Sequence, residues 1–410
     1  MKPLKLCIVG AGQFGVCFIP LFRAHPGISE VSLCESDPER LAKTSSDHGV
    51  RRVFASMGEV LRSDVDAVAI FTQRHSHAPL ALQGLRSGKH VYCAVPAATT
   101  LEELEELIEA VKSTGLTYMM GETSQYYGAS MFCRDKWESG AFGDFVYGEG
   151  EYCHDMAHGF YSAFRYSGGP DWKKVASYPP MLYPTHSIAM VLSVTGARMT
   201  SVSCLGYKDR SDDGIFHEEV SEWNNVFSNQ TALFRTSDGG MARINEFRRI
   251  GLSSKTRSVR LSLYGTKASF EEQSGAAAWV THEGSIEDVE SRIRCGAAEP
   301  TPTHQALIEA NPALQHDFVT DYAEVHQKAR LRLPAAFSKL HTGHEGSHHF
   351  LVDDFVTAVL HDTLPPVHIW QAARYNAPGI VAHQSSLREG EHMAIPDLGW
   401  PVEQACTERH

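Results

Sequence analysis

The 410-residue chain has no apolar run approaching the ~18 unbroken residues of a membrane-spanning helix. It also has no run of lysine and arginine, and its net charge of -12 at pH 7 argues against a nucleic-acid partner. Its nine cysteines are scattered without a C-x-x-C pair, which is typical of reduced thiols in a cytosolic protein. A strand pattern follows Met1 almost at once, so we expect no signal peptide, no membrane association and a cytoplasmic location.

Residues 1–125 alternate between strand and helix patterns. The segment 101–115 predicts an amphipathic helix, because its leucines recur on one face and Gly115 follows as a stop signal. This alternation predicts a Rossmann-type, doubly wound parallel sheet. Since a chain of 410 residues exceeds what one core normally organises, a second domain is expected over residues 126–410. The predicted strands of the first domain lie within residues 4–10, 31–36, 66–72, 89–96 and 116–122.

From about Phe142 the sequence becomes rich in strand patterns joined by glycine and aspartate turns. The "SDGG" turn at residues 237–240 joins two such runs into a predicted hairpin. We therefore expect a C-terminal α/β domain with a large open, mostly antiparallel sheet. Residues 295–305 are predicted to form a surface loop.

A glycine-rich turn stands between the first strand and the first helix. Gly10, Gly12 and Gly15 form G-x-G-x-x-G, which lets backbone amides approach a pyrophosphate at a helix N-terminus. Glu35 lies 20 residues past the turn, where a carboxylate accepts hydrogen bonds from ribose hydroxyls and repels a 2′-phosphate. These residues predict NAD rather than NADP, although Arg40 is close enough to pair with a phosphate.

Three segments carry a resemblance to a known family. "DAVAIFTQRHSHAPLALQGLRSGKHVYCAVPAATT", "ESGAFGDFVYGEGEYCHD" and "GHEGSHHFLVDDFVTAVLHD" are similar to the Gfo/Idh/MocA family of NAD(P)-dependent sugar oxidoreductases. The resemblance implies a Rossmann domain, a second domain whose open sheet often forms an oligomer interface, and a homo-oligomer, dimer or tetramer. It places Thr72, His75 and His77 near the nicotinamide. The other cofactor contacts expected here are Gln13, Phe14, Val95, Pro96 and Glu122.

Two catalytic groups that the family usually carries are absent. The family's Glu-Lys-Pro motif is replaced by Ala94, Val95 and Pro96, and its usual aspartate four residues before a histidine is replaced by Leu182, before His186. The segments "YPTH" and "EYCHD" resemble the NAD-dependent glycosidases of the α-N-acetylgalactosaminidase type, which also tend to lack the lysine. That resemblance implies glycoside cleavage without net redox change, through transient oxidation, elimination, hydration and reduction.

Such a cycle needs a base near neutral pKa and donors that stabilise an enolate. We expect His186 to be the base, with Tyr183 beside it and Tyr152 as the acid for the leaving group. In a strand, Tyr152 and His154 share one face, and at the start of a helix Tyr183 and His186 are neighbours. The residues expected to bind the carbohydrate substrate are His154, Trp172 and His344.

Two other functions remain open at this point. One is a sugar or polyol dehydrogenase in which Tyr183 or His186 replaces the lysine, and net release of NADH would identify it. The other is a non-catalytic NAD-binding sensor, which has no need of the tyrosine and histidine cluster. No metal is expected, because the histidine-rich segments "RHSHA" and "GHEGSHH" lack a recognised ligand spacing.

Overall fold

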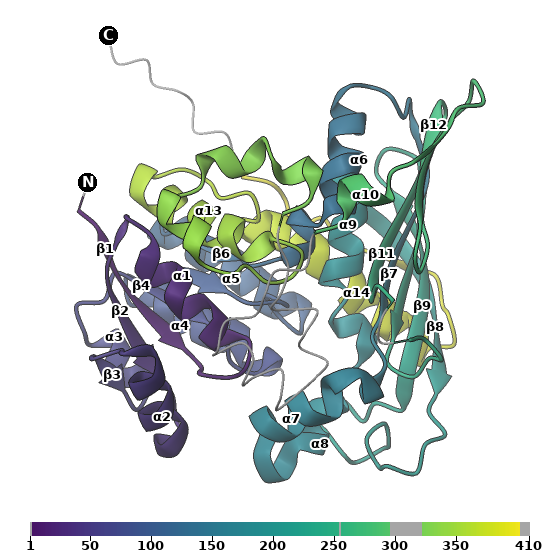
Figure 1. Cartoon of the computed structure of the whole chain (residues 1–410). Helices are drawn as coiled ribbons and strands as arrows, with labels where there is room; N and C mark the ends of the chain where they lie inside the picture. The colour runs from purple at the N-terminus through teal and green to yellow at the C-terminus, as the bar shows by residue number, and fades with distance from the viewer. Residues whose placement is uncertain (1, 254–255, 296–321, 402–410) are drawn as a thin grey trace.

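The computed structural model describes residues 2–253, 256–295 and 322–401. Two β-sheets stand at opposite sides of the molecule with helices between them (Figure 1). Residues 296–305 of the predicted surface loop lie outside the described residues. None of the helices in these ranges has the length and hydropathy that a bilayer crossing requires.

The N-terminal sheet is the predicted parallel Rossmann-type sheet. Its strand order is β3-β2-β1-β4-β5-β6, and the neighbouring strands pair in parallel. The sequence did not reveal the two-residue strand β3. The strands are β1 (Leu4–Val9), β2 (Ile28–Cys34), β3 (Val53–Phe54), β4 (Ala67–Ile70), β5 (His90–Cys93) and β6 (Tyr118–Met120).

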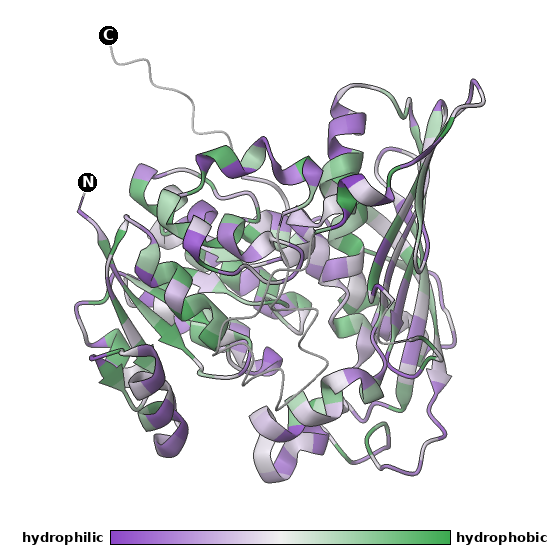
Figure 2. Ribbon diagram, viewed as in Figure 1, coloured by the Kyte–Doolittle hydropathy of each residue, from purple (hydrophilic) through white to green (hydrophobic). Residues whose placement is uncertain are grey.

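Helices cover both faces of this sheet, whose strands are largely hydrophobic in Figure 2. One face packs against α3 (Met57–Leu61), α4 (His77–Arg86) and α5 (Leu101–Thr114). The predicted helix over residues 101–115 is confirmed, with Thr100 as N-cap and Gly115 left-handed at its end. The other face packs against α1 (Ile19–Ala24) and α13 (Ser347–His361), while α2 (Pro38–His48) follows β2.

The chain therefore returns to its N-terminal sheet after completing the second one. In α13, Phe350, Phe355 and Val356 are fully buried with the residues of β1 and α1. Asp353 accepts a hydrogen bond at 3.3 Å from His25, which follows α1. The division at residue 125 marks the end of the parallel sheet, but residues of the C-terminal half complete its core.

The second sheet is the predicted large, mostly antiparallel sheet. Its order is β14-β13-β12-β11-β7-β10-β9-β8-β15, and among the described strands only β7 and β10 pair in parallel. The predicted "SDGG" hairpin joins β9 to β10. The strands are β7 (Phe145–Cys153), β8 (Met199–Lys208), β9 (Phe227–Thr236), β10 (Met241–Phe247), β11 (Val259–Gly265), β12 (Ala268–Glu272), β13 (Ala277–Thr281), β14 (Ile286–Asp288) and β15 (Met393–Ala394).

One face of this sheet is covered by helices, the largest being α6 (Gly128–Glu138), α9 (Thr185–Thr195) and α14 (Ile369–Leu387), as Figure 1 shows. Helix α9 lies unusually close to β7, because a Cβ on Gly150 would stand 2.0 Å from the carbonyl oxygen of Ser187. The absence of a side chain at Gly150 thus sets the position of the first turn of α9. Short elements also include α7 (Tyr161–Gly168), α8 (Trp172–Ala176) and α10 (Glu290–Ile293).

The opposite face of the second sheet is open. The pairing register puts Tyr147, Leu205, Leu233 and Met241 on this face, with Arg243 bound to Glu149 between them. The exposed fractions of Leu205, Leu233 and Met241 are 65%, 59% and 52%. An apolar sheet face of this kind is rarely left in water.

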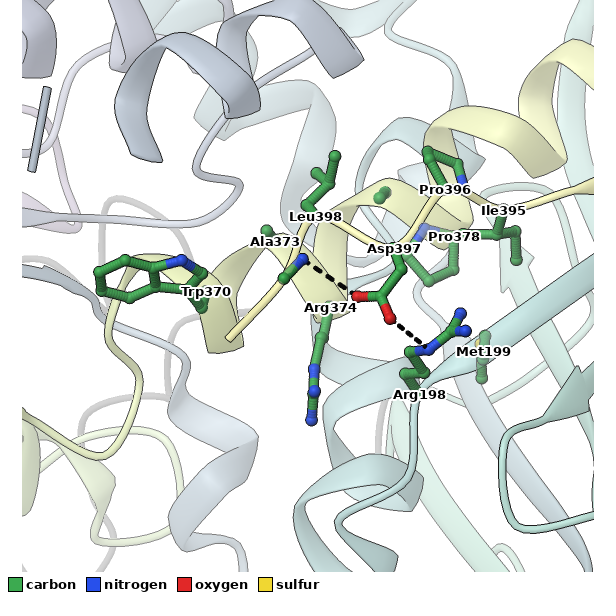
Figure 3. Close-up of a pocket in the computed structure, with 12 residues that line it drawn as sticks. Arg198, Met199, Trp370, Ala373, Arg374, Pro378, Ile395, Pro396, Asp397 and Leu398 are labelled. Carbon is green, nitrogen blue, oxygen red and sulfur yellow. Dashed lines mark hydrogen bonds and ion pairs between the residues drawn. The ribbon is translucent and has the colours of Figure 1, made fainter. Parts of the chain in front are cut away.

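A recess near the C-terminal end of the described chain lies beside α14 (Figure 3). Asp397 in this recess accepts a hydrogen bond from the Gly399 amide and pairs with Arg198 at 3.0 Å. Arg374 lies over the Trp400 ring, 3.9 Å from its centroid. Arg198 and Asp397 thus pair with each other, and none of the predicted site residues lines this recess.

Candidate functional site

The glycine turn has the geometry that a dinucleotide requires. Gly10 has a φ of +98°, and a Cβ there would stand 2.8 Å from the Phe71 carbonyl oxygen. A Cβ on Gly15 would stand 2.5 Å from the Gly10 oxygen, whereas a Cβ on Gly12 would meet nothing within 4 Å. Gly10 and Gly15 therefore allow the turn to pack against the end of β4, and Gly12 leaves open space on the ligand side.

Glu35 stabilises this turn through a hydrogen bond, and it lies where an acceptor for the ribose is expected. It follows β2, is 7% exposed and accepts a hydrogen bond from the Ala11 amide at 2.9 Å and from the Asp37 amide at 3.0 Å. Arg40 lies 3.5 Å from the same carboxylate and donates to the Tyr166 carbonyl oxygen at 3.3 Å. Together with the open side of Gly12, this carboxylate fits NAD.

Other predicted cofactor residues stabilise the turns next to the expected nicotinamide position. The ring nitrogens of His77 lie 2.8 Å and 3.0 Å from the carbonyl oxygens of Pro96 and Thr72. Burial lowers the pKa of His77 to about 4, so the ring is neutral and donates to one carbonyl. His77 thus fixes the turns that follow β4 and β5. Val95 is 7% exposed and packs in the core.

The remaining cofactor candidates lie along the same edge of the parallel sheet. Thr72 hydrogen-bonds to Ser76 at 2.7 Å, and the ring of the exposed His75 lies 6.4 Å from that of Trp223. Gln13 accepts through its carbonyl oxygen from Cys17. Phe14 packs its ring edge-on against Phe71, at 5.7 Å between centroids.

A buried ion pair joins the end of the parallel sheet to the second domain. Glu122, which follows β6, is 0% exposed, and one of its oxygens lies 2.6 Å from Nδ1 of His186 at the start of α9. Burial opposes the imidazolium, but the Glu122 charge outweighs burial and raises the pKa of His186 to about 10. The His186 charge in turn keeps the pKa of Glu122 below its usual range despite burial. Glu122, predicted as a cofactor contact, therefore lies against His186.

Two tyrosines surround the ion pair. The Tyr183 hydroxyl lies 3.3 Å from Nε2 of His186, and the Tyr152 ring is 5.4 Å from the His186 ring. The Tyr152 hydroxyl lies 3.1 Å from Nδ1 of His154, whose Nε2 is 2.9 Å from the His158 carbonyl oxygen. A neutral His154 that donates to this carbonyl presents Nδ1 as the acceptor for the Tyr152 proton. The structure thus brings together Tyr152, His154, Tyr183 and His186.

Two predicted substrate residues lie elsewhere. Trp172 begins α8 and packs against Tyr161 and Arg165, with the guanidinium carbon 4.9 Å from its ring centroid. The ring of His344 lies 5.3 Å from that of Phe14, so His344 is beside the glycine turn rather than beside Tyr183. Trp172 follows a segment rich in glycine and proline, and His344 lies in a turn before α13, so the sequence spacing gave no information on the direction of either side chain.

Three charged residues were missed by sequence reasoning. Glu246 is 0% exposed, accepts a hydrogen bond from Ser187 at 2.5 Å and pairs with Arg248 at 2.9 Å. Burial raises the pKa of Glu246 to about 7 although Arg248 opposes this shift. Arg74 lies with its guanidinium carbon 4.3 Å from the centroid of the Tyr183 ring. The sequence signal that could have revealed them is charged residues at inward-facing positions of a predicted strand, as in "NEFRR".

Within the described ranges, no three or more His, Cys, Asp or Glu side chains are grouped so that they would hold a metal ion.

The Glu122–His186 pair predicts an unusual histidine titration. In Glu122→Gln, burial acts on His186 without the opposing charge, so the His186 pKa should fall from about 10 to below 6.5. In the unmodified protein the folded state holds this proton more tightly, so the stability it contributes is full below pH 6.5 and is lost as the pH rises towards about 10. Histidine NMR titration checks the shift, and urea unfolding at pH 6 and pH 9 checks the sign. Exposed Glu105→Gln is the control, and a His186 midpoint near 6.5 in the unmodified protein would contradict the pair.

The position of Glu35 predicts the cofactor preference. Glu35→Ala should weaken binding of NAD more than binding of NADP, because it removes a ribose acceptor and a charge that repels a 2′-phosphate. Calorimetric titration of both cofactors measures this, with Glu39→Ala on the first turn of α2 as control. A preference for NADP in the unmodified protein would show that Glu35 does not have this role.

Comparisons with known proteins agree with the fold and the glycine turn. Residues 4–122 match the Gfo/Idh/MocA family model, described as an oxidoreductase family with an NAD-binding Rossmann fold. A glycosyl hydrolase family 109 protein of Saccharopolyspora erythraea is 31% identical over 202 residues, which are 46% of this chain and 44% of that protein. Another, of Streptomyces filamentosus, is 25% identical over 96% of this chain and 77% of its own length. The chain thus spans about half the length of the first curated relatives that it matches.

Solved structures share the whole architecture at low sequence identity. An oxidoreductase from Agrobacterium radiobacter in complex with NAD+, L-tartaric acid and magnesium has a TM-score of 0.72 at 14% identity, over 96% of this chain and 98% of that one. Levoglucosan dehydrogenase in complex with NADH and levoglucosan has a TM-score of 0.71 at 16% identity, over 96% and 100% of the two chains. Residues 4–122 thus match the NAD-binding Rossmann domain of the Gfo/Idh/MocA oxidoreductase family, and the whole chain shares the fold of these solved structures.

Proposed function

We propose that the protein is a cytoplasmic, NAD-dependent enzyme that cleaves a glycosidic bond of a carbohydrate without net redox change. The observation that carries this proposal is the cluster of Tyr152, Tyr183 and His186 around the buried Glu122, in a site whose usual lysine position holds Val95. The similarity to glycosyl hydrolase family 109 proteins supports it. NAD, when bound, supplies a reversible hydride acceptor for a sugar carbinol.

The ion pair favours a division of roles different from the one predicted. His186, expected as the base, holds its proton at neutral pH because Glu122 stabilises the imidazolium. A cationic imidazole donates a hydrogen bond, so His186 and Tyr183 are suited to stabilising negative charge on the oxygen of an oxidised sugar. Oxidation of a carbinol to a ketone makes the neighbouring C–H acidic, and that proton still needs a base.

Tyr152 is the group best placed to accept that proton. His154 takes up its hydroxyl proton, and the Arg248 guanidinium lies 4.6 Å from the centroid of its ring. The charges of Arg248 and His186 both stabilise a phenolate at this position. Once the proton has been removed, the leaving group departs by elimination, water adds to the double bond, and the ketone is reduced back to the carbinol. Sugar and cofactor thus end in their original oxidation states.

The overall reaction is tested with a panel of nitrophenyl glycosides and added NAD+. Phenolate release without net accumulation of reduced nicotinamide supports the proposal. Accumulation of reduced nicotinamide in proportion to substrate would instead identify a sugar or polyol dehydrogenase. Tight NAD binding with neither signal across the panel would favour the sensor.

The roles of Tyr152 and His186 are separated by isotope exchange. With substrate deuterated beside the oxidised carbon, Tyr152→Phe should lose label exchange into solvent by about 10²–10⁴-fold, since a positioned base contributes about that much. Transient reduction of the nicotinamide should persist in this variant. His186→Ala should slow turnover by about 10²–10³-fold while NAD stays bound, as expected for a lost oxyanion donor.

Tyr207→Phe, on the open sheet face, is the matched control and should exchange normally. If exchange persists in Tyr152→Phe and is lost in His186→Ala, then His186 is the base and the two roles are reversed.

We also propose that the open sheet face forms the contact of a homo-oligomer, either a dimer or a tetramer. Leu205→Glu combined with Leu233→Glu places charge on two exposed apolar positions of this face and should dissociate the oligomer. Light scattering at micromolar concentration measures this, with Leu364→Glu, an exposed leucine outside the sheet, as control. A monomeric unmodified protein would rule out this assembly.

A further inference from the structure

A recess lined by two arginines adjoins the proposed reaction site. We call it the arginine recess. Its walls come from the second domain except for Arg74, which follows β4 of the parallel sheet. It shares Tyr183 with the tyrosine and histidine cluster, so a substituent of a bound sugar can enter it. The residues that define the arginine recess are Arg74, Met156, Phe164, Tyr178, Tyr183 and Arg248.

Arg74 presents an uncompensated charge to this recess. Its guanidinium carbon lies 4.3 Å from the centroid of the Tyr183 ring and 5.4 Å from those of Phe164 and Tyr178. Among residues 2–253, 256–295 and 322–401, no carboxylate pairs with Arg74 and no acceptor takes a hydrogen bond from it. A guanidinium packed on aromatic faces keeps its N–H donors at its edge, where they match a carboxylate or sulfate.

Arg248, which follows β10, contributes a second guanidinium to the arginine recess. Its side chain is 8% exposed and pairs with Glu246, which is itself buried and also binds Ser187. Arg248 therefore has a carboxylate partner, and the Glu122 charge is matched by His186. Arg74 is the arginine of this recess for which the described residues provide no carboxylate within ion-pair distance.

A neutral sugar would leave the Arg74 charge without a counter-ion in a recess lined largely by apolar and aromatic side chains, which is energetically unfavourable. We propose that the arginine recess binds an anionic substituent of the substrate, so that the glycoside is an acidic one, bearing a uronate carboxylate or a sulfate ester. This inference rests on the proposed function, because it takes the recess to be part of the carbohydrate site.

The test uses the full chain saturated with NAD+ and isothermal calorimetry. The probes are glucuronate and galacturonate, each compared with its uncharged methyl ester, and glucose 6-sulfate compared with glucose. We expect at least one acid to bind at least tenfold more tightly than its neutral partner. Which pair shows the difference distinguishes a carboxylate from a sulfate ester.

Arg74→Gln should reduce this ratio to within about twofold of unity, and Arg74→Lys should restore part of it because the charge remains. Arg86→Gln, at the exposed end of the helix that follows Arg74, is the matched control and should keep the ratio. Circular dichroism and bound NAD confirm that each variant is folded. Arg248 is not substituted, because removing it would leave Glu246 buried without its partner.

Equal binding of acid and neutral partner in every pair would overturn the inference, as would an unchanged ratio in Arg74→Gln. A loss of NAD affinity in Arg74→Gln with the ratio intact would assign Arg74 to the cofactor and also overturn it. Cleavage of neutral glycosides that is unaffected by Arg74→Gln would leave the proposed function standing without this inference. Acid-selective binding without cleavage of any glycoside would support the anion-binding role of the recess and contradict the proposed function.

Discussion

The buried contact between Glu122 and His186 is the constraint on which the rest of the site depends. The carboxylate follows the last strand of the parallel sheet, and the imidazole begins a helix of the second domain. Both groups are withdrawn from water, so each is tolerable only with the other in place. The helix is held against β7 by the absence of a side chain at Gly150. The ion pair thus ties the end of the parallel sheet to the first turn of α9.

Under the proposed function, this constraint also bears on how Tyr152 would act as the base. A phenol near neutral pH is a poor acceptor unless positive charge surrounds its oxygen. Here Glu122 keeps His186 protonated, and Arg248 lies over the ring of Tyr152. His154, whose Nδ1 lies 3.1 Å from the Tyr152 hydroxyl, is placed to take up the displaced proton. Under the proposed function, the charges of His186 and Arg248 take the place of the lysine that the end of β5 lacks.

Much of this architecture is readable from sequence because it rests on local rules. The glycine spacing, the helix ended by Gly115 and the "SDGG" hairpin each follow from backbone chemistry within a few residues. Strand and helix periods likewise relate Tyr152 to His154 and Tyr183 to His186, whereas the resemblance to the glycosidases led us to expect both pairs in one site.

What the sequence did not reveal depends on contacts between distant segments. Glu122 and His186 are 64 positions apart, so no period relates them, and Glu122 was predicted as a cofactor contact. The return of α13 to the first sheet brings His344 beside Phe14 rather than beside the substrate residues. Trp172 lies in a segment with glycine and proline that nevertheless forms a helical turn. Long-range packing decides each of these cases.

Long-range packing also bears on the segment in which Ala94, Val95 and Pro96 replace the family's Glu-Lys-Pro motif. The backbone there is held in place: the Ala97 amide donates to Asn376 of α14 at 2.9 Å, and His77 lies 2.8 Å from the Pro96 carbonyl oxygen. Val95 itself is buried in the main core. A lysine at the buried position of Val95 would place an ammonium in this core, which is costly unless a carboxylate pairs with it. An apolar residue at the end of β5 is therefore consistent with a site whose proton chemistry lies in the second domain.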